Sequence, residues 1–231
     1  MATARELQVG RLMADPAAGF GGAARIRIAD GRIAAVEPLG GEADDPGAGL
    51  VALPAPANAH DHGRGLRPLA FDDDEDLLRE ARLAWRLTRG LADAEGLSAT
   101  GLFEALCRNG RRSIVGEDGG GVIAPGAPAD ILVLDAAAML PDACGREVEV
   151  MDLLLTRMTK RHVSTLMVAG REIVRDARCV SVDLPALEAE LHAQARAAAA
   201  TAPVDRAYLA RLQAAVADFY RAGGHKAGPR P

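Results

Sequence analysis

Two groups of short apolar segments, one toward each end of the chain, constrain the fold of this sequence most. In the first group, residues 25–28 alternate polar and apolar side chains, Asp30-Gly31 follows, and residues 32–36 run back. Asp-Gly between such segments is a strong signal for a β-hairpin, because glycine tolerates the positive φ of the turn. Residues 50–53 have the length and character of a short buried strand. The first 53 residues are therefore predicted to be β structure.

The second group lies between residues 119 and 180. Residues 130–135 form an almost wholly apolar segment, and residues 163–168 lead through a turn at Ala169-Gly170 into residues 172–174. Short apolar segments bounded by turn residues are typical of strands. The sequence therefore predicts a second β region after the middle of the chain.

The stretch between the two groups has the pattern of helices. Residues 72–90 begin with three aspartates, 72–74, which favour a helix N-terminus, and arginines crowd the later turns, where cations are favoured. A second helix is predicted from Ser98, as its N-cap, to a stop at Asn109-Gly110.

The last fifty residues are predicted to hold two more helices. Asp183 is placed to cap the first, and Asp205 follows Pro203 at the start of the second, which should end near Gly223. Residues 224–231 are expected to be disordered.

Composition excludes several classes of function. The formal net charge is −5 and no basic stripe carries aromatic residues, so nucleic-acid binding is not expected. No apolar run approaches the roughly 20 residues of a membrane span. Three cysteines without a C-x-x-C spacing argue against a disulfide framework or a zinc knuckle. We therefore expect a cytoplasmic protein that binds neither membrane nor nucleic acid.

One short motif carries chemistry: Asn58-Ala59-His60-Asp61-His62-Gly63, which directly follows the strand predicted at 50–53. In an extended segment, residues i and i+2 project to the same face, so His60 and His62 can point at one centre. Neutral imidazoles suit zinc, iron and similar metals. His60 and His62 are therefore the candidate metal ligands, and an exposed loop is the alternative interpretation of the same residues.

The segment Leu53-Pro54-Ala55-Pro56-Ala57-Asn58-Ala59-His60-Asp61-His62 resembles the amidohydrolase superfamily, and within it the cytosine-deaminase and chlorohydrolase-like branch. In that branch a short strand and a turn precede Asn-Ala-His-x-His. Residues 119–135 resemble a second signature of the same family, G-x-I-x-P-G-x-x-A-D-hydrophobic-D, and residues 163–174 resemble its closing hairpin. The resemblance implies a β-sandwich, made jointly by both ends of the chain, around a catalytic (β/α)₈ barrel.

The chain is too short between the two motifs for that barrel. Residues 63–118, 56 in all, separate His62 from Gly119, whereas a complete barrel takes about 200 residues or more. We therefore predict a mixed α and β fold: a composite β-sandwich from residues 1–53 and 119–180, a barrel remnant that cannot close at 54–118, and C-terminal helices with a frayed tail at 181–231.

The resemblance implies a metal-dependent hydrolase of C–N bonds other than peptide bonds, deaminase-like, with zinc or iron as the metal. A catalytic zinc site normally has three protein ligands, and only two are identified here. Metal binding is therefore expected to be weak or absent, no catalytic residue is identified, and the single chain is expected to be truncated and inactive. His162, His192 and His225 are expected to be surface residues.

Two other functions fit the same sequence. The chain is either a non-catalytic interaction module or one half of a split hydrolase, completed by a partner chain that supplies the missing barrel and only then acts on a small molecule. Apolar residues on the middle helices would lose their barrel neighbours and need another cover, which is each other, the sandwich or a second molecule. Of these covers, a homodimer or another partner is expected. The residues are Leu77, Leu78, Ala81, Trp85, Leu102 and Leu106.

Overall fold

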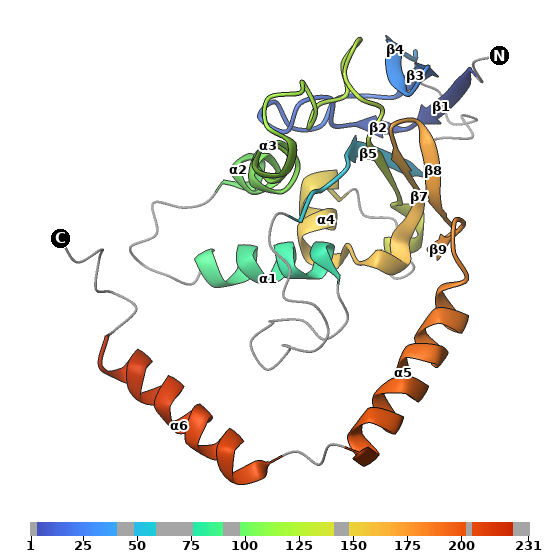
Figure 1. The fold of residues 1–231 in the computed structure, drawn as a ribbon. Helices are drawn as coiled ribbons and strands as arrows, with labels where there is room; N and C mark the ends of the chain where they lie inside the picture. The colour runs from blue at the N-terminus through green and yellow to red at the C-terminus, as the bar shows by residue number, and fades with distance from the viewer. Residues whose placement is uncertain are drawn as a thin grey trace. The chain divides into compact units, whose positions relative to one another are not determined.

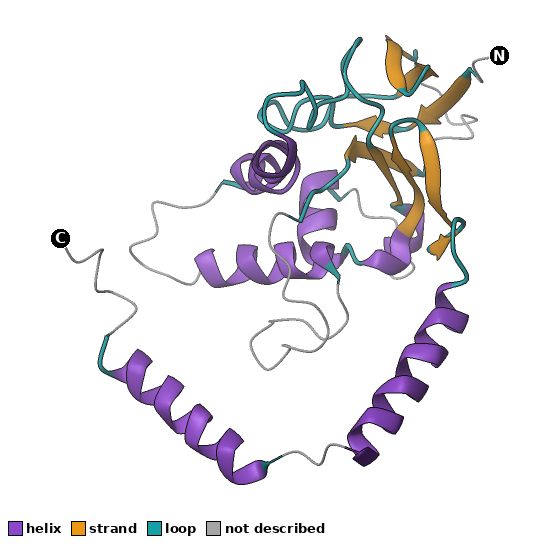
Figure 2. Ribbon diagram, in the orientation of Figure 1, coloured by secondary structure: helices purple, strands orange, loops and turns teal. Residues whose placement is uncertain are grey.

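The computed structural model describes residues 4–40, 49–58, 76–89, 98–140, 148–201 and 205–223. The chain divides into two units, residues 1–182 and 183–231 (Figure 1). Two sheets and several helices make up the first unit, and the described residues of the second unit form two helices (Figure 2). The predicted mixed α and β class is confirmed. Within the described residues, no helix has both the length and the apolar character that crossing a membrane requires.

The smaller sheet contains three antiparallel strands from the first 38 residues. Strand β3, Ala24–Ala29, pairs with β1, Arg5–Val9, on one side and with β4, Arg32–Pro38, on the other. Asp30 and Gly31 join β3 to β4 with φ angles of 52° and 77°. Two positive φ angles in a two-residue connection are the requirement of a type I′ turn, so the predicted hairpin is confirmed.

The larger sheet combines strands from both sides of the middle helices. Its order is β2-β5-β6-β7-β8-β9. Strands β5 and β6 pair antiparallel, from Leu50 opposite Asp135 to Pro54 opposite Ile131. Segments more than 75 residues apart in the sequence are thereby made neighbours. The six strands are Arg11–Leu12, Leu50–Pro54, Ile131–Asp135, Val163–Val168, Arg171–Arg175 and Arg178–Cys179.

Both faces of β5 and β6 are buried. Side chains of alternate residues lie in two separate apolar clusters, as the period of two in a strand requires. One cluster joins this sheet to the smaller sheet and the other joins it to helices. Toward the smaller sheet lie Ala52, Ile131 and Val133, packed with Ile26, Ile28 and Ile33; toward the helices lie Val51, Leu53, Leu132 and Leu134.

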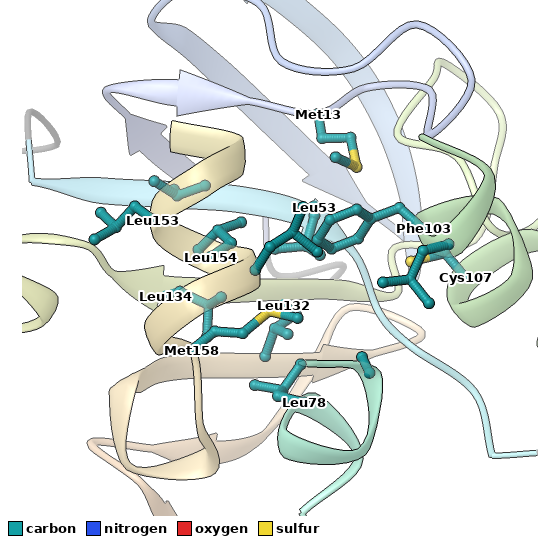
Figure 3. Close-up of a cluster of buried hydrophobic side chains, with 14 of the residues drawn as sticks. Met13, Leu53, Leu78, Phe103, Cys107, Leu132, Leu134, Leu153, Leu154 and Met158 are labelled. Atoms are coloured by element: carbon teal, nitrogen blue, oxygen red, sulfur yellow. The ribbon is translucent and has the colours of Figure 1, made fainter. Parts of the chain in front are cut away.

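The helical layer packs on the second face of the larger sheet (Figure 3). It contains α1, Leu77–Arg89; a continuous run made of α2, Ala99–Phe103, a π-helical segment, Glu104–Asn109, and α3, Gly110–Val115; and α4, Val150–Arg157. Short 3₁₀ turns at Ala137–Met139 and Lys160–His162 flank α4. Phe103, Leu154 and Met158 are fully buried at the centre of this layer.

Two predictions about these helices are corrected, and one helix is added. The first helix is capped by Asp76, whose Oδ1 accepts hydrogen bonds from the backbone N–H of Leu78 and Arg79 at 3.1 and 3.2 Å; residues 72–74 lie outside the described residues. The predicted stop at Asn109-Gly110 is wrong, because the helical run continues to Val115 and ends at Gly116, where φ is 77°. Helix α4 was not predicted.

The apolar residues of the middle helices are covered within the chain. Leu78, Ala81 and Leu102 are buried in the cluster on the larger sheet, and Trp85 and Leu106 are partly buried against it. The cover comes from β5, β6 and α4. Leu78, Ala81 and Leu102 are therefore covered by the sheet and by α4, one of the covers that the sequence allowed, and a homodimer or another partner stays a prediction.

The second unit contains α5, Leu184–Thr201, and α6, Arg206–Arg221. Asp183 Oδ1 accepts the N–H of Ala186 at 3.1 Å, and Asp205 Oδ1 accepts the N–H of Tyr208 at 2.9 Å. The predicted N-cap Asp183 and the two helices are confirmed, and Asp205 caps the second helix. The predicted disorder of residues 224–231 falls outside the described residues.

Replacement of Leu154 tests the helical layer. Leu154 is 0 % exposed in α4, so Leu154→Ala should lower the free energy of unfolding by about 2–5 kcal/mol in urea titrations. Leu187 on α5 is 55 % exposed and is a matched control, since Leu187→Ala should change the stability by about 0.5 kcal/mol or less. Equal effects of the two substitutions would show that α4 does not pack on the sheet.

Candidate functional site

The two predicted metal ligands, His60 and His62, lie outside the described residues, as does all of 59–75. The structure describes the chain up to Asn58, two residues before His60. The described residues nearest to the motif are those on its N-terminal side, where the chain leaves β5.

The chain leaving β5 is held from two sides. Pro54 is buried and is the last residue paired with β6. The N–H of Ala55 donates to the carbonyl of Asp130 at 3.0 Å. Backbone hydrogen bonding to the segment of β6 therefore continues one residue beyond the end of β5. The N–H of Ala57 donates to the carbonyl of Leu106 at 2.9 Å, on the helical run. Residues 54–57 are thus fixed between the larger sheet and this helix.

Cys107 adds a third contact to the same segment. Its thiol lies 3.2 Å from the carbonyl oxygen of Pro54 and is buried. Burial raises the pKa of Cys107 to about 12, because the thiolate would be desolvated there. The thiol therefore stays protonated at neutral pH and acts as a hydrogen-bond donor, which leaves it unsuited to nucleophilic or metal chemistry.

Asp130, from the second sequence motif, anchors three segments. Its Oδ1 accepts the N–H of Ala169 at 2.6 Å, and its Oδ2 pairs with Arg111 of α3. Arg111 also donates to Asp118, with Nη2 and Oδ2 2.6 Å apart. The hydrogen bond from Arg111 lowers the pKa of Asp118, and that bond also raises the pKa of Arg111. Asp130 thus has a structural role, joining the start of β6, the β7–β8 turn and the helical run.

Asp76 and His162 also have structural roles. Buried Asp76 accepts backbone N–H groups of Leu78, Arg79 and Lys160, the last at 2.8 Å. His162 is partly buried in a capping box, where its Nδ1 accepts the N–H of Thr159 at 3.2 Å, and burial lowers its pKa. His162 therefore lies partly exposed, with its ring used in a helix cap. His192 is exposed as predicted, and His225 lies outside the described residues.

A polar hollow of about 300 Å³ lies where the β3–β4 and β7–β8 turns meet. Sequence reasoning did not single it out, because its residues come from two hairpins distant in the chain. Arg5 and Glu172 pair across it at 3.4 Å. It is lined by Arg5, Asp30, Gly31, Ala169, Gly170, Arg171 and Glu172. The two turns approach so closely that a Cβ on Gly31 would lie 2.9 Å from the carbonyl of Ala169.

The described ranges bring together no group of three His, Cys, Asp or Glu side chains that could hold a metal ion. The chemistry of the predicted donor set, two neutral imidazoles at positions i and i+2, fits a divalent metal such as zinc but supplies two ligands.

Removing the carboxylate of Asp130 should destabilise the chain more than removing the carboxylate of Asp118. Asp130→Ala leaves the partly buried Arg111 and the N–H of Ala169 without this carboxylate, so we expect a loss of about 3 kcal/mol. Asp118 is more exposed and contacts the same arginine, so Asp118→Ala should cost about 1 kcal/mol or less. Denaturant unfolding of both variants checks the order, and a larger loss for Asp118→Ala would contradict the assigned role of Asp130.

Comparison with family models and with curated proteins gives no match. Solved structures do match. An adenosine deaminase from Xanthomonas campestris with bound zinc is 25 % identical over 55 % of this chain and 28 % of its own, with a TM-score of 0.47. An atrazine chlorohydrolase from Arthrobacter aurescens TC1 complexed with zinc is 29 % identical over 50 % of this chain and 25 % of its own, with a TM-score of 0.41.

A third match is an amidohydrolase from an environmental sample of the Sargasso Sea, 23 % identical over 52 % of this chain and 27 % of its own, with a TM-score of 0.40. The chain therefore spans about a quarter of the length of these solved structures. Each of the three is matched over about half of this chain.

Proposed function

We propose that this chain derives from a metal-dependent amidohydrolase acting on C–N bonds other than peptide bonds, that it binds a divalent metal weakly through His60 and His62, and that alone it does not turn over a substrate. The observation that carries the proposal is the pairing of β5 with β6. The two sequence motifs that resemble the family were identified separately, and each contains or borders one of these strands. The fold makes the two strands neighbours in register.

The position of the histidine motif relative to this pair supports a metal role. His60 follows β5 by six residues, and Ala55 and Ala57 are hydrogen-bonded on the way. A chain segment held by backbone hydrogen bonds is a suitable support for metal ligands that follow it, because metal sites depend on contacts that orient their ligands. The imidazole pair would hold zinc or iron, and the metal would supply Lewis-acid chemistry to a bound small molecule.

The chain between the motifs supports the absence of catalysis. Within residues 63–118, the described residues, 76–89 and 98–118, contain helices and no strand. Structural zinc sites with four ligands bind with roughly 10–16 kcal/mol. Two ligands would supply about half of that, which corresponds to dissociation constants of about 1 μM or weaker. A metal held this loosely, without a third protein ligand, is a poor catalyst.

Metal analysis tests the proposal. The purified chain should take up zinc weakly, lose it to EDTA, and show no hydrolysis with a panel of deaminase and amidase substrates. The double variant His60→Ala, His62→Ala should abolish zinc uptake measured by calorimetry, whereas His192→Ala, which removes an exposed helix histidine, should leave it unchanged.

Two outcomes would contradict the proposal, and a third would favour an alternative to it. Stoichiometric metal that survives EDTA would mean that further ligands complete the site. Turnover by the chain alone would disprove inactivity. Turnover only after addition of a second polypeptide would favour the split-hydrolase alternative.

A second candidate function, association through the second unit, is favoured by a stripe on α6. Leu209, Leu212, Val216 and Phe219 recur at intervals of three, four and three residues and are 38–51 % exposed. That spacing is the repeat of a coiled-coil seam. Covering the exposed half of four such side chains on each of two helices would contribute roughly 6–12 kcal/mol. Association costs about 4–15 kcal/mol, so we propose a concentration-dependent homodimer.

A matched pair of substitutions tests this dimer. Leu212→Glu places a charge in the stripe and should give a monomer at every concentration in light scattering. Gln213→Glu adds the same side chain one position away, outside the stripe, and should keep the dimer. A wild-type chain that stays monomeric at high concentration, or a dimer that survives Leu212→Glu, would rule out the α6 seam.

A further inference from the structure

The helical run beside β5 contains a π-helical segment, Glu104–Asn109, between two α-helical turns. In such a segment the hydrogen bonds reach back five residues instead of four. Here the N–H of Gly110 bonds to the carbonyl of Ala105, and the carbonyl of Leu106 accepts the N–H of Ala57. The carbonyl of Leu106, within the π-helical segment, therefore accepts a hydrogen bond from outside the helix, from the chain that leaves β5.

Gly110 allows the two segments to come this close. It lies in ordinary helical conformation, with φ of −58° and ψ of −48°. The backbone conformation at this position therefore does not require glycine. A Cβ at this position would lie 2.3 Å from the carbonyl oxygen of Ala57. Both partners of that clash are backbone, so a side chain of any size would have to move the segment or the helix.

The thiol of Cys107 completes the contact by meeting the carbonyl of Pro54 at 3.2 Å. Three neighbouring positions of one helix face, Leu106, Cys107 and Gly110, thus hold Pro54 and Ala57. We call these five residues the strand-exit clamp. Figure 3 shows Cys107 beside the chain that leaves β5.

We propose that the strand-exit clamp positions the metal-binding motif, with Gly110 and Cys107 as positioning residues. The inference rests on the proposed function, because it assigns the clamp to the His60 and His62 pair. In the sequence only Asn58 and Ala59 separate the clamp from His60. A displaced Ala57 therefore moves the start of the ligand-bearing segment, in the way that a lost supporting contact misorients a metal ligand.

Cobalt(II) titration of the full chain tests the clamp. Gly110→Ala should weaken cobalt binding about tenfold, the size of effect expected from a lost supporting contact, and should change the d–d absorption of the bound ion. It should also speed hydrogen exchange at the Ala57 amide. Gly22→Ala is the matched control, since Gly22 has open space around its Cβ position, and it should leave all three readouts unchanged.

Cys107 provides a second pair of variants that keeps the test decisive if Gly110→Ala fails to fold. Cys107→Ser retains a donor toward Pro54, and Cys107→Ala removes it at nearly the same size. Serine should preserve the cobalt affinity better than alanine. Equal affinities in this pair, or wild-type cobalt binding by Gly110→Ala, would overturn the positioning role. Absence of cobalt binding by the wild-type chain would instead overturn the proposed function and the inference with it.

Discussion

The pairing of β5 with β6 is the interaction on which the rest of the first unit depends. Five residue pairs, from Leu50–Asp135 to Pro54–Ile131, join segments on either side of the middle helices. Because alternate side chains of both strands are buried on opposite faces, one strand pair supplies the centre of two apolar clusters. At roughly 1.5–3 kcal/mol for each fully buried aliphatic side chain, this pair carries a large share of the core.

The same pairing fixes the exit of β5, which leads to the proposed metal-binding motif. Pro54 ends the paired region, and the next residues are hydrogen-bonded to Asp130 on the sheet side and to Leu106 on the helix side. Asp130, from the second motif, therefore supports the chain that leads to the first motif. Its side chain fixes the start of β6, and its backbone carbonyl accepts a hydrogen bond from the N–H of Ala55. The proposed metal-binding segment therefore follows a strand exit that residues of both motifs support.

Local signals predicted much of this fold. The Asp30-Gly31 turn, the strand at 131–135 and the caps Ser98 and Asp183 depend on a few adjacent residues, and each was found. Gly110 was misinterpreted as a helix stop because its role depends on Ala57, more than 50 residues away. Helix α4 was missed because Glu149, its N-cap, makes no side-chain capping hydrogen bond. For the site, the sequence predicted a ligand pair, which lies outside the described residues, and the strand before it, whereas the clamp came only from the fold.

The β5–β6 pairing is tested most directly by measuring whether the backbones of Ala52 and Val133, which lie opposite each other in the two strands, are in contact. Nuclear magnetic resonance of the labelled chain should show cross-strand Overhauser effects between these two residues, together with slow hydrogen exchange at both amides. If those effects are missing and the Ala52 amide exchanges as in an unfolded peptide, the two motifs are not neighbours, and the proposed origin of the metal-binding segment is wrong.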